Sequence, residues 1–195
     1  MTYVELIVVL SIFAVTTSIA LFNHRLFQER IDLKNLANDI ALKVVEAQKA
    51  ALSGKLPPSG GYGASWKPSY GIYFNLLSPG DDHTFIYFTD LNQSGDYTDP
   101  SFCPIPGDGG ECLDKINITN DNRVTEMKVY YQDGGITPTT TSDLSINFTR
   151  PNGGAVLRSS AGFSSAPSFV EITIVSPQGA TAELKIYTSG RIEIS

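Results

Sequence analysis

The fold is decided by the stretch of residues 3–22, YVELIVVLSIFAVTTSIALF, in which Glu5 is the only charged residue. At about 1.5 Å per residue, a helix of this length matches the bilayer hydrocarbon core, which is about 30 Å thick. Neither Gly nor Pro occurs between Met1 and Leu52. The sequence therefore predicts one unbroken helix of roughly 50 residues, whose first half suits lipid or a bundle of apolar helices.

The second half of this helix has an amphipathic pattern. Apolar residues recur at spacings of three and four, at Leu33, Leu36, Ala37, Ile40, Val44, Ala47 and Ala51. Gly54 is a suitable C-cap, and Pro57 and Pro58 prevent the helix from continuing. A cleaved signal peptide is the alternative for the apolar stretch, but no positive charge precedes it and no A-x-A step follows it.

Glu5 needs an explanation, because it is an acid inside an apolar run. Its place in the first helical turn is favoured by the macrodipole by less than ~1 kcal/mol, whereas a carboxylate near the bilayer centre costs on the order of 3 kcal/mol. Two explanations stay open. Glu5 either reaches the membrane surface, or it pairs with a cation from a neighbouring helix, for which the N-terminal amine is the obvious candidate.

The segment M-T-Y-V-E-L-I-V-V-L resembles the mature N-terminus of type IV pilins and type II secretion pseudopilins, with Met1, Thr2 and Glu5 at the matching positions. The resemblance implies that a prepilin peptidase removes a short leader and methylates Met1, so that the sequence is numbered from the mature end. It also implies that Met1 and Glu5 act in assembly. Phe22 stands where many members carry Pro, so the usual helix-breaking signal is missing.

The rest of the chain has a β pattern. A segment rich in Gly and Ser follows the helix and indicates a linker. Strands are predicted at Tyr70–Asn75, Thr84–Thr89, Lys115–Thr119, Glu126–Gln132, Leu144–Arg150, Ala155–Arg158, Phe169–Ser176, Ala182–Thr188 and Arg191–Ile194. The Thr-rich tract Thr137–Ser142 is predicted to be an exposed loop. The pattern indicates an antiparallel β domain of one or two sheets that packs on the helix.

This β region is similar to the H-type pseudopilin and its competence-pilin relatives. The similarity lies in Y-G-I-Y-F at 70–74, F-x-D-L-N-x-S-G-x-Y at 88–97 and T-S-G-R-I-E-I-S at 188–195. It implies an α+β class, the type IV pilin fold, with a long N-terminal helix packed on an antiparallel sheet or sandwich-like domain. Some competence members bind DNA through a basic Gly-Arg motif in the last hairpin. Here Gly190-Arg191 precedes Ile192-Glu193, so direct DNA binding is not carried over.

We therefore divide the chain into four segments. Residues 1–25 are the transmembrane or filament-core half of the helix, and residues 26–53 are its amphipathic half. Residues 54–69 form the linker, and residues 70–195 form the globular antiparallel β domain.

The acidic residues concentrate in the middle third of the chain. The net charge is −6 overall, and residues 60–135 contain 11 acidic and 4 basic residues. The side-chain oxygens of Asp90, Asn92 and Ser94 alternate before Gly95, as in the first half of an EF-hand-like calcium loop. We predict a calcium site in this loop, and the candidate ligands are Asp90, Asn92, Ser94, Asp96 and Asp99.

The usual Glu at the twelfth position of such a loop is missing, because Ser101 stands there; Asp99 or Glu111 can take its place. A solvated hairpin turn is the alternative, since Asn, Asp and Gly also favour turns.

Cys103 and Cys112 are the only cysteines. A metal site would need further ligands, and no His is near. Because we expect the domain to be exported, a disulfide is the prediction, worth roughly 2–3 kcal/mol for a loop of this size, and two free thiols are the alternative.

No catalytic motif of the G-x-S-x-G, P-loop or H-E-x-x-H type occurs, so we expect no enzyme and no organic cofactor. The main hypothesis is a major pilin, a structural subunit that forms a homopolymeric type IV pilus for adhesion, motility or DNA uptake. It would lie in the inner membrane before assembly by the pilus machinery, and afterwards in a surface filament. The alternatives are a minor pilin or pseudopilin that primes a secretion or competence pseudopilus, and a monomeric membrane-anchored binding domain.

Overall fold

The structure is a computed structural model of the 195-residue chain. It describes residues 2–57, 65–78, 80–98, 103, 110–134 and 137–195, and within the helix it does not describe the side chains of residues 20–26.

The helix α1 extends over Tyr3–Ser53 and begins at the N-cap Thr2. Gly54 ends it in the left-handed conformation, with φ 74°, and its N–H reaches the carbonyls of Ala50 and Ala51. Gly is favoured here because a Cβ is strained at positive φ. The C-cap predicted from the sequence is therefore confirmed.

Ten strands follow, divided between two antiparallel five-stranded sheets. Sheet A has the order β3-β2-β1-β6-β7, and its strands are β1 (Ser69–Asn75), β2 (Thr84–Thr89), β3 (Cys112–Asn117), β6 (Asp143–Thr149) and β7 (Ala155–Arg158). Sheet B has the order β10-β9-β8-β4-β5, and its strands are β4 (Arg123–Tyr131), β5 (Thr139–Thr141), β8 (Pro167–Val175), β9 (Thr181–Tyr187) and β10 (Ile192–Ile194). A single turn of 3₁₀ helix, η1 (Asp81–His83), precedes β2.

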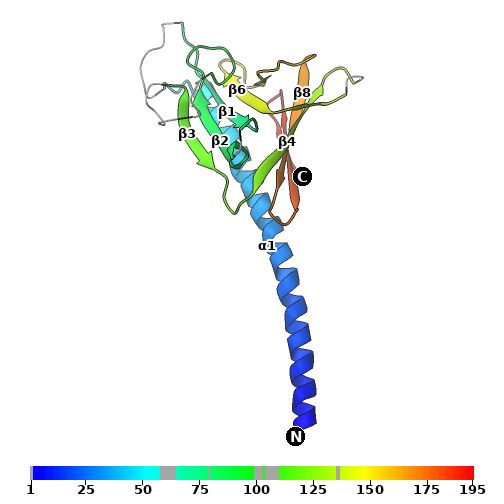
Figure 1. The fold of residues 1–195 in the computed structure, drawn as a ribbon. Helices are drawn as coiled ribbons and strands as arrows, with labels where there is room; N and C mark the ends of the chain where they lie inside the picture. Colours follow the sequence, from blue (N-terminus) through cyan, green and yellow to red (C-terminus); the bar gives the residue numbers. More distant parts are fainter. Residues whose placement is uncertain (1, 58–64, 79, 99–102, 104–109, 135–136) are drawn as a thin grey trace.

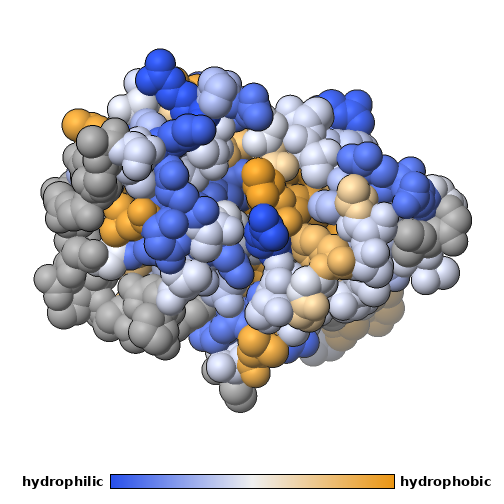
Figure 2. Space-filling model, turned by 90° about the horizontal axis from the view of Figure 1, so that it is seen from above, coloured by the Kyte–Doolittle hydropathy of each residue, from blue (hydrophilic) through white to orange (hydrophobic). Residues whose placement is uncertain are grey.

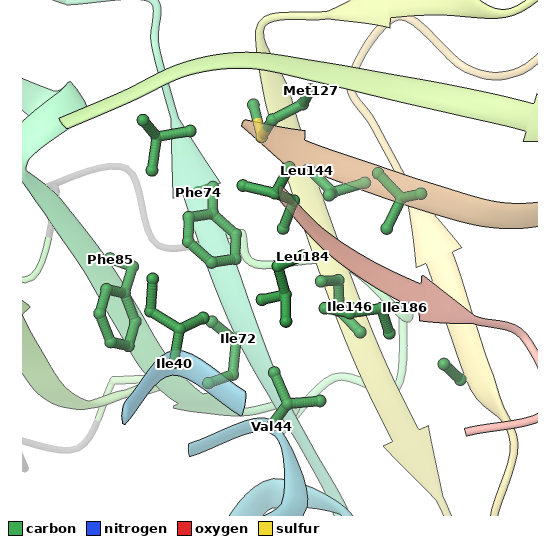
Figure 3. Packing of buried hydrophobic residues seen from close by; sticks show 14 of the residues in the cluster. Ile40, Val44, Ile72, Phe74, Phe85, Met127, Leu144, Ile146, Leu184 and Ile186 are labelled. Carbon is green, nitrogen blue, oxygen red and sulfur yellow. The ribbon is translucent and has the colours of Figure 1, made fainter. Parts of the chain in front are cut away.

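The second half of α1 and the inner faces of both sheets share one hydrophobic core (Figures 1 and 3). The helix contributes the stripe predicted from the sequence, including Ile40 and Val44, which are fully buried. Sheet A contributes Ile72 and Ile146, and sheet B contributes side chains such as Leu184. Both sheets contact the helix, so the core holds three elements together.

The fold class expected from the sequence is wrong. The type IV pilin arrangement, a long N-terminal helix packed on an antiparallel sheet or sandwich-like domain, does not describe this chain. The structure is mostly β, with ten strands in two sheets, and its helix packs against them only through the second half. The physical reason is that two sets of strands have apolar inner faces, which one narrow helical stripe cannot cover alone.

One strand was missed from the sequence. Thr139–Thr141 forms β5, which pairs with β4 at the edge of sheet B, where we expected an exposed loop. A run of Thr carries no apolar–polar alternation, although each Thr is β-branched and fits an extended edge. All nine strands that were predicted are present, with ends shifted by at most a few residues.

No helix of the described residues is both long enough and apolar enough to cross a membrane.

Candidate functional site

The first part of α1, residues 3–19, projects away from the β domain (Figure 1). Its large apolar side chains are 48–79% exposed, and they lie on all sides of the helix. The hydroxyls of Ser11, Thr16 and Thr17 donate to carbonyls one turn earlier, at 2.7–3.0 Å. Such bonds satisfy the hydroxyls inside the helix itself. This segment therefore offers an almost wholly apolar surface.

Glu5 has a local role that sequence reasoning overlooked. The Thr2 N–H donates to Glu5 Oε2 at 3.3 Å, and the Glu5 N–H donates to Thr2 Oγ1 at 3.4 Å. This reciprocal pair is a capping box, whose signal T-x-x-E was present in the sequence. The carboxylate thus caps its own helix. Met1 lies outside the described residues, and the role of both residues in assembly stays a prediction.

At the other end of the molecule, Asp90 organises the loop that follows β2. Its side chain is only 1% exposed. Oδ1 accepts the N–H of Ser94 at 3.0 Å, and Oδ2 accepts the N–H of Gly95 at 2.9 Å. Oδ2 also accepts Nδ2 of Asn147 on β6 at 2.8 Å and the hydroxyl of Ser69 on β1 at 3.4 Å. Asp90 therefore ties the loop to two central strands of sheet A.

The other predicted ligands lie in the same loop. Asn92 Oδ1 accepts the Ser94 N–H at 2.8 Å, and the Ser94 hydroxyl donates to the Asp96 carbonyl at 3.0 Å. Asp96 Oδ1 accepts the Tyr97 N–H at 2.8 Å and also the hydroxyl of Ser145. The structure therefore brings four of the five predicted ligands into one compact turn, and Asp99 lies outside the described residues.

Glu111 is a second buried carboxylate at this loop, and its residue is 6% exposed. Its Oε2 accepts both the N–H and the hydroxyl of Thr98, at 2.8 and 2.9 Å. Its Oε1 is buried without a hydrogen-bond partner among the described residues. Burial raises the pKa of this carboxyl, the Thr98 donors oppose the rise, and the charge of Asp90 adds to it. The backbone N–H of Asn92 also opposes the rise in pKa.

Within the described ranges, no three His, Cys, Asp or Glu side chains gather around one point as a ready metal site. A cation at this loop would therefore rely on two carboxylates and on neutral oxygens. Ser69, Ser145 and Asn147, which hold the two aspartates, gave no signal in the sequence, because they come from strands distant along the chain.

The predicted disulfide joins Cys103 and Cys112, whose Cα atoms are 5.4 Å apart. Both cysteines belong to a small apolar cluster with Ile86, Phe88 and Tyr97, separate from the main core. The disulfide therefore holds Cys103 at the first residue of β3, beside Ile86 and Phe88 of β2.

Arg191 in the last hairpin has partners on its own sheet. Its guanidinium carbon lies 4.0 Å from the centroid of the Tyr187 ring, and Nη1 lies 3.1 Å from Glu193 Oε1. The row of rings continues across the sheet, since Phe169 stacks between Tyr187 and Tyr130 at 5.0 and 4.4 Å. The expectation that this hairpin does not bind DNA stays a prediction.

The end of the β domain opposite the N-terminus shows mainly hydrophilic side chains, with a few hydrophobic ones between them (Figure 2). It thus differs in kind from the surface of residues 3–19. Comparison of the chain with family models, with curated proteins and with solved structures found no match. The argument for function therefore rests on the residues themselves.

Proposed function

We propose that this chain is a structural subunit of a surface filament of the type IV pilus kind, which polymerises through residues 3–19 of α1. The exposure of this segment is the observation that carries the proposal. A helix that is apolar all round is stable where it is buried, since each Å² of apolar surface removed from water contributes about 25 cal/mol. The core that the sheets share with the second half of α1 leaves this first segment uncovered.

The geometry of the subunit supports a bundle of helices rather than a lone anchor. The segment extends along the axis of α1 beyond the β domain, so that copies can pack their helices together with the β domains outside (Figure 1). A repeated contact between different surfaces of identical subunits builds an open filament. Before assembly, the inner membrane would cover the same apolar surface, and prepilin peptidase and the assembly machinery would process the chain. The disulfide suits an exported domain.

A charge placed in the segment tests the proposal. Leu10→Lys puts an ammonium group among apolar side chains, so we expect the wild-type chain in filaments sheared from the cell surface and at least a tenfold lower yield for Leu10→Lys. Leu77→Lys is the matched control, because Leu77 is 63% exposed and Leu10 is 59% exposed, but Leu77 lies after β1. The control should assemble like the wild type.

Immunoblots of sheared filaments, with total cell protein as the reference, give the yield. Assembly of Leu10→Lys at the wild-type level would show that the segment is not the polymerisation surface. If the chain is present at only a few copies per filament, the subunit is a minor pilin or pseudopilin. If it is absent from filaments and monomeric in detergent, the anchored binding domain is correct.

A further inference from the structure

Asp90 and Glu111 are two buried acids that have no cationic partner within the part of the chain that the structure describes. Among the described residues, no Lys, Arg or His makes an ion pair with either carboxylate. A Cβ placed on Gly95 would lie 3.5 Å from Nε of Arg158, so this cation lies close to the loop, yet among the described contacts it forms an ion pair with neither acid. Burying a charge without a compensating charge is costly, and a buried polar atom without a partner calls for an ion or water.

Several oxygens in this loop and beside it can accept a further partner. Glu111 Oε1 has no donor, and Asp90 Oδ1 and Asn92 Oδ1 each accept a single N–H, from Ser94, among the described contacts. An ionised carboxylate oxygen and an amide oxygen can each accept two partners. These oxygens therefore keep free acceptor positions while their hydrogen bonds hold the loop in shape.

From this geometry we infer that the loop of residues 90–98 binds a calcium ion. Glu111, just before β3, supplies the carboxylate that takes the place of the missing twelfth-position Glu. Asp90 and Asn92 supply side-chain oxygens, and neutral carbonyl and hydroxyl oxygens near Ser94 complete the shell. Calcium accepts six to eight oxygen ligands in irregular geometry, whereas magnesium requires a near-ideal octahedron. The ion offsets the charge of both acids and gives Glu111 Oε1 its partner.

Gly95 fits this role by its backbone. Its φ is 80°, and its N–H donates to the Asp90 carboxylate five residues earlier. The turn at Gly95 therefore returns the chain to Asp90 and closes the loop on its carboxylate.

Calorimetric titration of the full-length, disulfide-bonded chain in mild detergent tests the site. CaCl₂ should bind with one-to-one stoichiometry and a Kd on the order of 10⁻⁴ M, as in extracellular calcium modules, and MgCl₂ should bind at least tenfold more weakly. Glu111→Gln keeps an acceptor for Thr98 but removes the charge, so it should weaken calcium binding at least tenfold. The matched control is Asp114→Asn, an exposed acid on β3, three residues after Glu111, and it should bind like the wild type.

Thermal unfolding gives an independent reading. At calcium about 100-fold above Kd, the melting temperature of the wild type and of Asp114→Asn should rise by about 5–10 °C, and that of Glu111→Gln should not respond. The inference fails if the wild type shows neither a binding heat nor a change in melting temperature between millimolar calcium and excess chelator. It also fails if Glu111→Gln folds and binds calcium as tightly as the wild type.

Discussion

Glu5 combines two demands on one side chain. In the isolated subunit it closes a capping box with Thr2, which satisfies donors at the helix N-terminus. In an assembled filament the same carboxylate would lie among apolar helices, where an unpaired charge is costly. Capping and charge pairing both explain why an acid stands here, and they differ in whether the charge itself is needed.

Substitution of Glu5 separates these roles. Glu5→Gln keeps a side-chain acceptor for the Thr2 N–H and removes the charge, whereas Glu5→Ala removes both. If the carboxylate pairs with a cation of a neighbouring subunit, such as the Met1 amine, both variants should lower the yield of sheared filaments at least tenfold. A wild-type yield from Glu5→Gln together with a low yield from Glu5→Ala would leave capping as the only role.

Gly71 on β1 is a second residue whose identity is fixed by its surroundings. A Cβ at this position would lie 2.6 Å from the carbonyl oxygen of Ile146 and 2.7 Å from the ring of Phe88. The ring belongs to the cross-strand partner of Gly71, and the carbonyl belongs to the neighbouring strand β6. Since a backbone carbonyl inside a sheet cannot move aside freely, no side chain fits here without strain.

We expect Gly71→Ala to lower the free energy of unfolding by about 1–3 kcal/mol, the usual cost of overpacking. Gly134→Ala is the control, because a Cβ there meets nothing within 4 Å, and it should change stability by less than about 0.5 kcal/mol. Chemical denaturation measures both. Equal stability of the two variants would mean that β1 and β6 separate more easily than the structure indicates.

At the scale of elements, the disulfide holds an acidic segment that has little apolar content of its own. Its cysteines join a cluster with Ile86 and Phe88 of β2 and with Tyr97 of the loop that follows. A cross-link over nine positions lowers the entropy of the unfolded chain by the equivalent of roughly 2–3 kcal/mol. Replacing both cysteines by Ser should therefore reduce stability by about this amount.

Reduction gives the same comparison without mutation. Reductant should lower the denaturation midpoint of the wild type to that of the double Cys→Ser variant, and it should not change the variant. Mass analysis after alkylation checks the starting state. Two alkylated thiols in unreduced, exported protein would contradict the cross-link.

The sequence predicted elements better than it predicted their arrangement. The spacing of apolar residues located the stripe of α1, and alternation located strands such as β8, because these signals are local. The division into two sheets depends on pairing, for example of β1 with β6, about 75 residues apart. No local pattern reports that pairing, so the fold class was wrong while most strands were right.

The same limit applies to the candidate sites. The alternation of Asp90 and Asn92 was visible in the sequence. Glu111 was only one of two possible substitutes for the missing twelfth-position Glu. The burial of its carboxyl oxygen depends on which strand pairs beside it, and the local sequence does not report that pairing. Asn147 shows the limit most clearly, because its bond to Asp90 joins residues 57 positions apart.

On the scale of the whole molecule, α1 belongs to two environments. Its first part is exposed and apolar, whereas one face of its second part is buried against the sheets (Figures 1 and 3). Filament assembly through the first part would transmit force to the β domain only through the second. The contact of α1 with the core must therefore be strong, and it includes the hydrogen bond from Gln48 Nε2 to the Gly153 carbonyl at 2.6 Å.

Two neighbouring positions on α1 test this contact. Ile40 is 0% exposed in the shared core, and Leu42 is 65% exposed. Ile40→Ala removes apolar contacts in the shared core and leaves a cavity, so it should cost about 2–5 kcal/mol. Leu42→Ala loses little buried surface and should stay within about 0.5 kcal/mol of the wild type.

The way the chain unfolds distinguishes a shared core from a loosely attached helix. Trp66, the only tryptophan, lies in the β part and donates to the Asp90 carbonyl at 3.0 Å, so its fluorescence reports on sheet A. Circular dichroism at 222 nm reports mainly on the helix. Because helix and sheets bury one another, Ile40→Ala should shift both transitions together by the same amount. If the dichroism shifts while Trp66 fluorescence does not, the helix unfolds on its own, and the β domain owes its stability to the pairing of its two sheets.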